Sequence, residues 1–469
     1  MKQRFISHLS LSSGKIKGAI AIAAMILSTS ASKAEGYQVN TLSARQNGMG
    51  NVGTAMHLGA ESQFFNPAGL TSVKGNLEAT ASILPIFATA KATLPDGSSF
   101  TTDNGVSTPL SVTAGFSIYK NLKGGIAFYT PYGSGINWTD NWPGAVLNQS
   151  VTLKSFTIQP TLAWSPVKGL SIGAGLMISW GNVDLNKGLV DPGSFNTLQQ
   201  MLIVAGALPP AAYQEYGPST IPASINLKGK SKVALGVNVG VMYDINEKWT
   251  VGLSCRSLQK MKVDAGNATL RFANNHAQSI LDNQIGLLNQ SQFAAEMPLP
   301  AVVKIGAAYR PISPLVVAFD AQITGWKTYK SLDIDFLDDA LASYNQHIEK
   351  KYSNSWTFSL GAQYDLTKRF QIRAGVMVDT TPVDKEHYNP ETPGMTKISP
   401  SVGFSFYPIP QLSIDASFLY VAGLGAKNRS VEYPDLLMTK LTGAPVMNTF
   451  KADYHVHAFT PAIGVTLHI

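Results

Sequence analysis

The sequence has little of what most enzymes and helical membrane proteins of its length contain. Among 469 residues there is one cysteine, Cys255, so no internal disulfide can form. Beyond the N-terminal region no apolar run is long enough for a transmembrane helix, and the mean hydropathy is only +0.04. No linker, charge block or low-complexity segment divides the chain, although its length would ordinarily indicate several domains. These absences argue against a soluble multidomain enzyme.

The formal net charge of +7 is concentrated at the N-terminus. Five of the 36 Lys and Arg residues lie in residues 1–34, where there is no acidic residue, which leaves 31 basic and 29 acidic residues in the remainder. This near balance gives no support for nucleic-acid binding.

Residues 1–34 have the organisation of a secretory signal peptide. Basic residues precede the apolar run 18–27, and the small-x-small step at residues 32–34 predicts cleavage after Ala34. The alternative is a retained membrane anchor, but ten apolar residues are too few to span a bilayer. We therefore expect a mature envelope protein that begins at Glu35.

Strict alternation with period two recurs along the rest of the chain. Apolar side chains alternate with small or polar ones in residues 170–181, 233–245 and 370–379. Such segments run to about ten residues, longer than the usual strand of about five or six. At about 3.3 Å per residue and a steep tilt, that length suits a strand that crosses a membrane. Because an open sheet edge cannot be satisfied in hydrocarbon, these strands must close into a barrel.

The alternation identifies fourteen candidate strands. They cover residues 77–91, 108–120, 122–130, 151–165, 169–185, 231–246, 248–263, 301–310, 314–324, 356–366, 368–379, 397–408, 411–422 and 456–469. Short turns alternate with long connections, which lie at 92–107, 131–150, 186–230, 264–300, 325–355, 380–396 and 423–455. This asymmetry is typical of outer-membrane barrels, and an even strand number returns the chain to its starting side.

Aromatic side chains in the apolar register flank the short turns, as an interfacial girdle would. They are Trp164, Tyr243, Trp249, Tyr309, Tyr364 and Phe370. Residues 77–469 are therefore predicted to form an all-β, 14-stranded antiparallel transmembrane β-barrel. Alternation alone also fits a soluble β-sandwich, but the signal, the loop asymmetry and the girdle favour the barrel.

Residues 35–76 precede the barrel and lack strand periodicity. They are rich in glycine and lead into Asn66-Pro67-Ala68, where the proline pushes Asn66 out of the α region. Because so wide a barrel needs filling, we predict that these residues form a small N-terminal hatch, or plug, in the lumen.

Several motifs occur in a characteristic order. The mature start reads "EGYQVNTLSARQNGMGNVGTA", followed by "NPAGL", "EMPLPAVVKIGAAYR", "FDAQITGW" and "WTFSLGAQYDLTKRFQIRAGVMVDTTPV". Together they resemble the hatch, the NPA motif and the later strands of the FadL/TodX family of outer-membrane transporters for long-chain fatty acids and other hydrophobic compounds. The resemblance covers essentially the whole mature chain and departs at Ile469, where the family usually has a terminal aromatic residue.

The resemblance implies a passive, monomeric transporter in the outer membrane of a Gram-negative bacterium, with no catalytic residues, cofactor or metal. Its partners would be a hydrophobic ligand, foremost a long-chain fatty acid, and the lipid of the outer membrane. The ligand would bind in the barrel, the hatch would rearrange, and release would be lateral, into the bilayer. Uptake of aromatic hydrocarbons or other lipids is the alternative within this class.

The expected site residues fall into four groups. The hatch motif is Asn66, Pro67 and Ala68; the ligand pocket is Tyr37, Lys187 and either Lys350 or Lys351; the outer-loop apolar groove is Phe195, Leu198, Met201, Leu202, Leu287 and Leu288; and the lateral-exit kink is Pro131, Gly133 and Gly135. The pocket residues follow from the resemblance, whereas the kink also follows from a proline that cannot donate to the sheet. Three of the groups have a plainer reading: exposed loop lysines are usually solvated, apolar stripes often pack a loop's own core, and the proline can simply end a strand.

Two other classes of function remain open. A general porin or adhesin-like barrel would bind no hydrophobic ligand, and an envelope esterase could use the G-x-S-x-G match at residues 169–173. That match lies inside a regular strand rather than in a strand-to-helix elbow, which argues against the esterase. Residues 455–457 read His-Val-His at a strand start, which is more typical of an interface than of a metal site.

Overall fold

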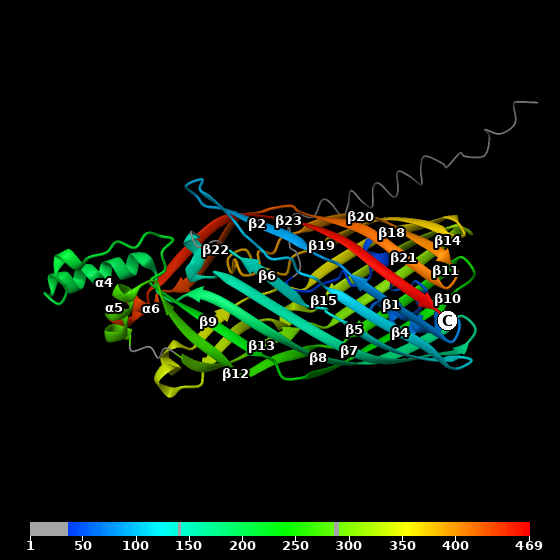
Figure 1. Cartoon of the computed structure of the whole chain (residues 1–469), viewed down its shortest axis with the longest axis horizontal. Coiled ribbons are helices and arrows are strands. Elements are labelled where there is room, and N and C mark those ends of the chain that lie inside the picture. The colour runs from blue at the N-terminus through cyan, green and yellow to red at the C-terminus, as the bar shows by residue number, and fades with distance from the viewer. Residues whose placement is uncertain (1–35, 139–141, 286–289) are drawn as a thin grey trace, which may run out of the picture. The chain divides into compact units, whose positions relative to one another are not determined.

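The computed structural model describes residues 36–138, 142–285 and 290–469, so the predicted signal peptide and its cleavage site lie outside the described residues. In these ranges 23 strand segments form one sheet, and every pair of neighbouring segments is antiparallel. The sheet closes where β1 (Leu77–Ile83) pairs with β23 (Met447–His468) (Figure 1). The result is a closed 14-stranded barrel, as predicted, in which many strands consist of two segments separated by a kink.

Numbered in chain order, the barrel strands are listed here with their segments. They are 1, β1 and β2 (Phe87–Thr93); 2, β3 (Ser99–Thr101) and β4 (Leu110–Tyr119); 3, β5 (Leu122–Tyr129) and β6 (Gly133–Asn137); 4, β7 (Ser150–Val167); 5, β8 (Leu170–Gly188); 6, β9 (Ala223–Lys230) and β10 (Ala234–Asp244); 7, β11 (Trp249–Arg256) and β12 (Gln259–Phe272); 8, β13 (Gln290–Leu299) and β14 (Val302–Ile312); 9, β15 (Leu315–Thr324) and β16 (Ser331–Phe336); 10, β17 (Gln346–Glu349) and β18 (Ser355–Thr367); 11, β19 (Phe370–Asp379); 12, β20 (Lys397–Ile409); 13, β21 (Leu412–Gly423) and β22 (Ala426–Pro434); and 14, β23.

The helices are short and belong to the hatch or to the long loops. The hatch contains α2 (Ala44–Asn47), η1 (Gly59–Glu61), α3 (Ser62–Phe65) and η2 (Pro67–Ser72). The loops contain η3 (Pro143–Val146), α4 (Pro192–Val204), η4 (Pro210–Ala212), α5 (Asn275–Ile285), η5 (Trp326–Thr328), η6 (Asp339–Tyr344) and α6 (Leu436–Thr442). Among the described residues, none of these helices is long and apolar enough to cross a membrane. Helices α4, α5 and α6 gather at the end of the barrel opposite the C-terminus (Figure 1).

The two faces of the wall differ as the alternation predicts. In β10, Leu235 and Val237 are 65% and 50% exposed on the outer face, whereas Asn238, the residue after Val237, is fully buried on the inner face. The girdle also lies on the outer face near the short turns, where Trp249 and Tyr309 stack with their ring centroids 4.4 Å apart. An apolar outer band with an interfacial aromatic pair is the surface that lipid requires.

The strands extend farther at the long-loop end than the sequence predicted. The predicted loop 186–230 contains the end of β8, helix α4 and β9, and the predicted loop 423–455 contains β22, α6 and the start of β23. The predicted unbroken strand 77–91 is divided at residues 84–86. Beyond the hydrocarbon both faces of a strand can be polar, so the alternation that reveals a strand inside the membrane disappears outside it.

Residues 36–76 pack against the inner face of the wall. Their backbone approaches wall glycines closely: a Cβ at Gly173 would lie 2.4 Å from the carbonyl carbon of Pro67, and one at Gly375 would lie 2.3 Å from the amide nitrogen of Gly50. Any larger residue would clash with the hatch backbone at these two positions, which is why both inward-facing positions are glycine.

Buried polar groups fix the hatch to the wall. One carboxylate oxygen of Asp320 on β15 accepts hydrogen bonds from the amides of Gly53 and Thr54 (2.8 and 3.0 Å) and from the Thr54 hydroxyl (2.8 Å). On another side of the lumen, Arg45 of α2 pairs with Asp415 of β21 at 3.3 Å. The hatch is therefore held at several points of the barrel circumference.

Candidate functional site

The hatch motif ties the hatch to two wall strands. Asn66 is fully buried and extended (φ −158°, ψ 109°), and its side-chain oxygen accepts a hydrogen bond from the Ala68 amide at 3.1 Å, which caps η2 with Pro67 in its first turn. Its side-chain amide donates to the Thr54 carbonyl at 2.8 Å and to carbonyls of β10 and β11 at 3.1 and 3.3 Å. The asparagine thus joins a hatch turn to the barrel wall, a role that Pro67 supports by fixing the backbone.

Barrel strand 3 is kinked where the sequence predicted. Tyr129 lies opposite Thr157 of β7 and Gly133 lies opposite Lys154, so four steps on barrel strand 3 match three on its neighbour. The extra residue is a β-bulge at residues 130–132, which include Pro131. The bulge bends the strand away from the regular ladder.

The N-terminal segment of the hatch, residues 37–39, lies against the inner side of this kink. The Val39 amide donates to the Pro131 carbonyl and the Gly133 amide donates to the Tyr37 carbonyl, both at 2.9 Å. Within the described residues, no backbone hydrogen bond joins residues 131–136 to barrel strand 2. At this point the hatch, rather than the neighbouring barrel strand, supplies hydrogen-bond partners to barrel strand 3.

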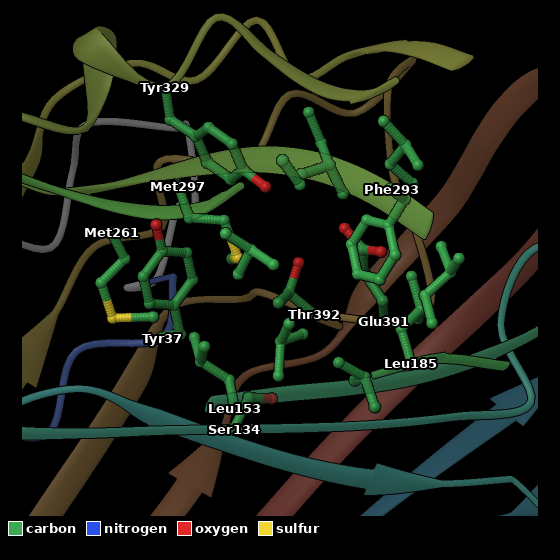
Figure 2. A pocket seen from close by; sticks show the side chains of 17 residues that line it. Tyr37, Ser134, Leu153, Leu185, Met261, Phe293, Met297, Tyr329, Glu391 and Thr392 are labelled. Atoms are coloured by element: carbon green, nitrogen blue, oxygen red, sulfur yellow. The ribbon is translucent and has the colours of Figure 1, made fainter. Parts of the chain in front are cut away.

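A largely apolar pocket lies between the N-terminal segment and the inner faces of barrel strands 3 to 9 (Figure 2). Its lining consists of Tyr37, Ser134, Val151, Leu153, Val183, Leu185, Leu227, Met261, Val263, Phe293, Ala295, Met297, Tyr329, Leu332, Ile334, Glu391 and Thr392. The enclosed cavity is about 50 Å³. One buried water needs roughly 10–15 Å³, so the cavity has room for only a few groups the size of a water molecule. A long chain could enter only if a lining side chain moved.

Tyr37 is the lining residue contributed by the hatch. Its ring packs edge-on against Trp326, Tyr329 and Tyr132, with centroid distances of 4.8, 6.0 and 6.1 Å. Its hydroxyl donates to the Pro298 carbonyl, and burial raises the pKa of Tyr37 well above its usual range, which keeps the hydroxyl neutral. The tyrosine therefore fills space in the pocket as a neutral group.

The charged part of the site consists of Glu391, Lys350 and Lys187. Lys350 is 1% exposed and donates a hydrogen bond to the Glu391 carboxylate, which lines the pocket; the Lys350 ammonium also lies 5.7 Å from the Tyr329 ring centroid. Lys187 donates to the Gln346 side chain at 2.9 Å, has no acidic partner within 4 Å among the described residues, and lies within the electrostatic reach of Lys350 and Glu391. One of the two lysines is thus neutralised by a carboxylate of the protein and the other is not.

The structure separates the remaining predicted residues. Lys351 points to solvent, where it pairs with Glu349 at 2.9 Å, so it does not reach the pocket. Phe195 and Leu198 of α4 are buried in a loop core with Tyr216 and Leu437, which is the plainer reading of the stripe. Of the other residues of the predicted groove, Met201 is 49% exposed and Leu202 is half-buried. Leu287 and Leu288 lie outside the described residues.

Glu391 and the aromatic residues Phe293, Trp326 and Tyr329 could not be identified as pocket residues from the sequence. They lie in segments predicted to be long outer loops, where no periodicity indicates a direction. A carboxylate inside the turn sequence "NPETPG" gave the one available signal, because a charged side chain between two prolines is held in a fixed loop.

Comparison with known proteins matches residues 25–468 to the sequence profile of the outer membrane protein transport protein family (OMPP1/FadL/TodX). Outer membrane protein P1 of Haemophilus influenzae is 24% identical over 294 residues, which is 62% of this chain and only 61% of the relative's length. The long-chain fatty acid transport protein of Escherichia coli is 22% identical over 308 residues, 65% of this chain and 67% of the relative.

Solved structures show the same fold. A FadL homologue from Pseudomonas aeruginosa superposes with a TM-score of 0.74 at 17% identity, covering 92% of this chain and 99% of the homologue. The toluene transporter TodX of Pseudomonas putida gives 0.67 at 13% identity, covering 93% and 100%. In the described part of the chain, no group of three or more His, Cys, Asp and Glu side chains is placed to hold a metal ion.

Proposed function

Because this chain belongs to the OMPP1/FadL/TodX family of outer-membrane transport proteins, we propose that it takes up hydrophobic molecules, long-chain fatty acids foremost, by binding them in the barrel and releasing them laterally into the bilayer. The family consists of transporters rather than enzymes, and its members reside in the outer membrane of Gram-negative bacteria. The ligand, the hatch rearrangement and the exit route are the parts of the proposal that experiments must test.

One observation carries the proposal: Tyr37 belongs both to the pocket and to the kink. Its ring lines the pocket, while its carbonyl accepts the hydrogen bond from Gly133 in the bulged strand. Because the cavity is too small for a long chain, a lining side chain must move when a ligand enters, and we propose that it is the Tyr37 ring. Displacing Tyr37 would also disturb the hydrogen bonds that Tyr37 and Val39 make with Gly133 and Pro131. Ligand binding in the pocket would thus be coupled to the kink, where, among the described residues, barrel strand 3 lacks backbone hydrogen bonds to barrel strand 2.

The charges of the site suit one carboxylate. With Lys350 matched by Glu391, the three groups together carry one net positive charge, located at Lys187. Lys187 follows the pocket residue Leu185 by two positions and so shares its inward face. A fatty acid would place its carboxylate beside Lys187 and its chain in the apolar pocket below.

Lateral exit follows from the chemistry of the ligand. Each buried methylene is worth about 0.8 kcal/mol, so a long chain would lose on the order of 10 kcal/mol on passing from the pocket into periplasmic water. Exit into lipid avoids that cost. The kink in barrel strand 3 lies beside the pocket lining residue Ser134 and lacks the usual ladder to barrel strand 2, which supports this place as the exit.

Uptake of aromatic hydrocarbons is a second candidate. Three aromatic rings line the pocket, Tyr37, Phe293 and Tyr329, and one structural neighbour is named a toluene transporter. An uncharged ring would need no contact with Lys187. The two candidates therefore differ in whether removal of that charge affects uptake.

Two adjacent alanines of β13 offer a matched test of the pocket. Ala295 lines the cavity, whereas Ala294 points to the opposite face of the strand. The full-length chain, including its predicted signal peptide, should be expressed in a Gram-negative host without its own fatty-acid transporter, and uptake of labelled oleate and toluene measured. Ala295→Phe should abolish uptake of the true ligand while Ala294→Phe retains it at equal surface levels.

Normal uptake of both compounds by Ala295→Phe would contradict the pocket. Loss of oleate uptake in Lys187→Gln identifies the fatty acid, and unchanged toluene uptake in that variant identifies the hydrocarbon. Steady ion conductance of the wild-type barrel in planar bilayers, without uptake of either compound, would indicate a general porin instead.

A further inference from the structure

A row of donors crosses the outer face of barrel strands 4 to 6. In the sheet register Lys154 of β7 lies opposite Asn182 of β8, which lies opposite Lys230 of β9. All three side chains are exposed on the outside of the wall. Because strands are about 4.8 Å apart, the two lysine Cα atoms are roughly 10 Å from each other, with the asparagine amide between them.

This row lies at the upper boundary of the apolar band. Two residues nearer the short-turn end, Phe156 and Trp180 stand opposite each other with ring centroids 6.0 Å apart, and Phe128 stacks on Phe156 at 6.2 Å. One further step in that direction brings Ile158 opposite Ile178. Aliphatic, then aromatic, then cationic rows are the order expected across the boundary between hydrocarbon and lipid headgroups.

The row also borders a surface groove. Its lining includes Lys154, Asn182 and Lys230 together with Asp184 and Lys228. Asp184 pairs with Lys228 at 3.3 Å, so its charge is already compensated. Among the described residues, neither Lys154 nor Lys230 has an acidic partner within 4 Å. The groove therefore presents two uncompensated ammonium groups and one amide at headgroup depth.

We propose that Lys154, Asn182 and Lys230 bind a phosphate group on the headgroup of an outer-leaflet lipid. A phosphate monoester carries up to two negative charges and accepts hydrogen bonds from several sides, which matches two ammonium groups that flank an amide. The adjoining Phe156 and Trp180 would contact the upper part of the acyl chains. The lipid stays outside the wall, so this site is distinct from the pocket in the lumen and does not depend on the transported ligand.

The test is a lipid titration of the full mature chain in an uncharged detergent. The probe is a diphosphorylated disaccharide lipid, and the bound fraction is measured by native mass spectrometry. Each lysine near an anionic surface contributes about a fivefold gain in binding, so the double variant Lys154→Gln/Lys230→Gln should bind roughly 25-fold more weakly. Lys154→Arg/Lys230→Arg should retain binding, because it preserves both charges.

A second pair of lysines provides the control for net charge. Lys260 and Lys262 face outward on β12 and both pair with Glu296, at 2.6 and 3.2 Å. Lys260→Gln/Lys262→Gln removes the same two charges from the outer wall, and we expect its binding to change by less than about twofold. Heat-modifiable mobility should confirm that every variant forms a barrel.

Three results would overturn the proposal. The first is that Lys154→Gln/Lys230→Gln binds the lipid as tightly as wild type. The Lys260/Lys262 variant could lose binding equally, which would indicate a diffuse surface field. Inorganic phosphate could displace the lipid completely at millimolar concentration, which would indicate a site for free anions; retention of the lipid under that competition supports a lipid-anchored occupant.

Discussion

Removal of the pocket carboxylate should change which ligands the protein prefers. In Glu391→Gln the buried Lys350 loses its acidic partner while the shape of the pocket is nearly unchanged. Breaking a buried ion pair by removing one partner costs about 3–5 kcal/mol, because it leaves a charge uncompensated. A ligand carboxylate that reaches Lys350 would recover part of this free energy. Recovery of only about 1.4 kcal/mol would strengthen the binding of an anionic ligand tenfold.

The assay compares two ligands that differ in their head groups. Binding of oleate and of oleyl alcohol to the purified variant is measured at about pH 6.5, where lysine side chains are normally protonated. We expect oleate to bind at least about tenfold more tightly than to wild type, and oleyl alcohol to change by less than about twofold. The matched control is Glu349→Gln, which removes an exposed glutamate that pairs with the exposed Lys351. That variant should leave both affinities unchanged.

An unchanged ratio of the two affinities in a folded Glu391→Gln barrel would refute this reasoning. It would mean that a bound head group does not reach Lys350, and that the Lys350–Glu391 pair has no part in ligand choice. Thermal unfolding of the variant, compared with wild type, separates a change in ligand preference from a loss of the barrel.

Three further predictions concern the wall, the hatch and the N-terminus. Pro131→Thr with Gly133→Val and Gly135→Val should abolish uptake while the purified variant still binds the ligand. A Cβ at either glycine would meet no atom closer than 3.3 Å, so the variant should fold. Transport at the wild-type rate would exclude lateral exit here. Asn66→Ala removes the side chain that joins η2 to β10 and β11, so uptake should fall at normal surface levels, whereas undiminished uptake would count against control by the hatch. N-terminal sequencing of outer-membrane fractions should find a heat-modifiable, β-rich protein that begins at Glu35; a soluble periplasmic product with an intact N-terminus would contradict this.

The kink illustrates how far local sequence reaches. Pro131 and the two glycines that follow it predicted a disturbed strand, and the bulge lies there, because a proline that cannot donate acts on its own strand. That the hydrogen-bond partners at the kink come from Tyr37 and Val39 could not be predicted, because those residues are about ninety positions away along the chain. Only the folded hatch brings the two segments together.

The charged residues show the same limit. Lys350 and Lys351 are adjacent and chemically equal in the sequence, yet one is 1% exposed and the other points to solvent. Residue 351 has a positive φ of 44°, and this change of backbone direction sends the two side chains to different environments. Glu391, which neutralises Lys350, follows it by 41 residues, a separation that no local pattern indicates.

The sequence by itself determined the barrel. Each membrane-spanning strand has lipid on one face and the lumen on the other, so its apolar and polar side chains must alternate with a period of two. This alternation can be recognised in each strand separately. It also determined the turn at Asn66-Pro67-Ala68, because proline and asparagine act within a turn. Tertiary structure alone decided the lengths of the strands beyond the membrane, the lining of the pocket and the pairing of its charges. These features depend on contacts between segments far apart in the chain, where burial and geometry, rather than any repeating local pattern, select the partners.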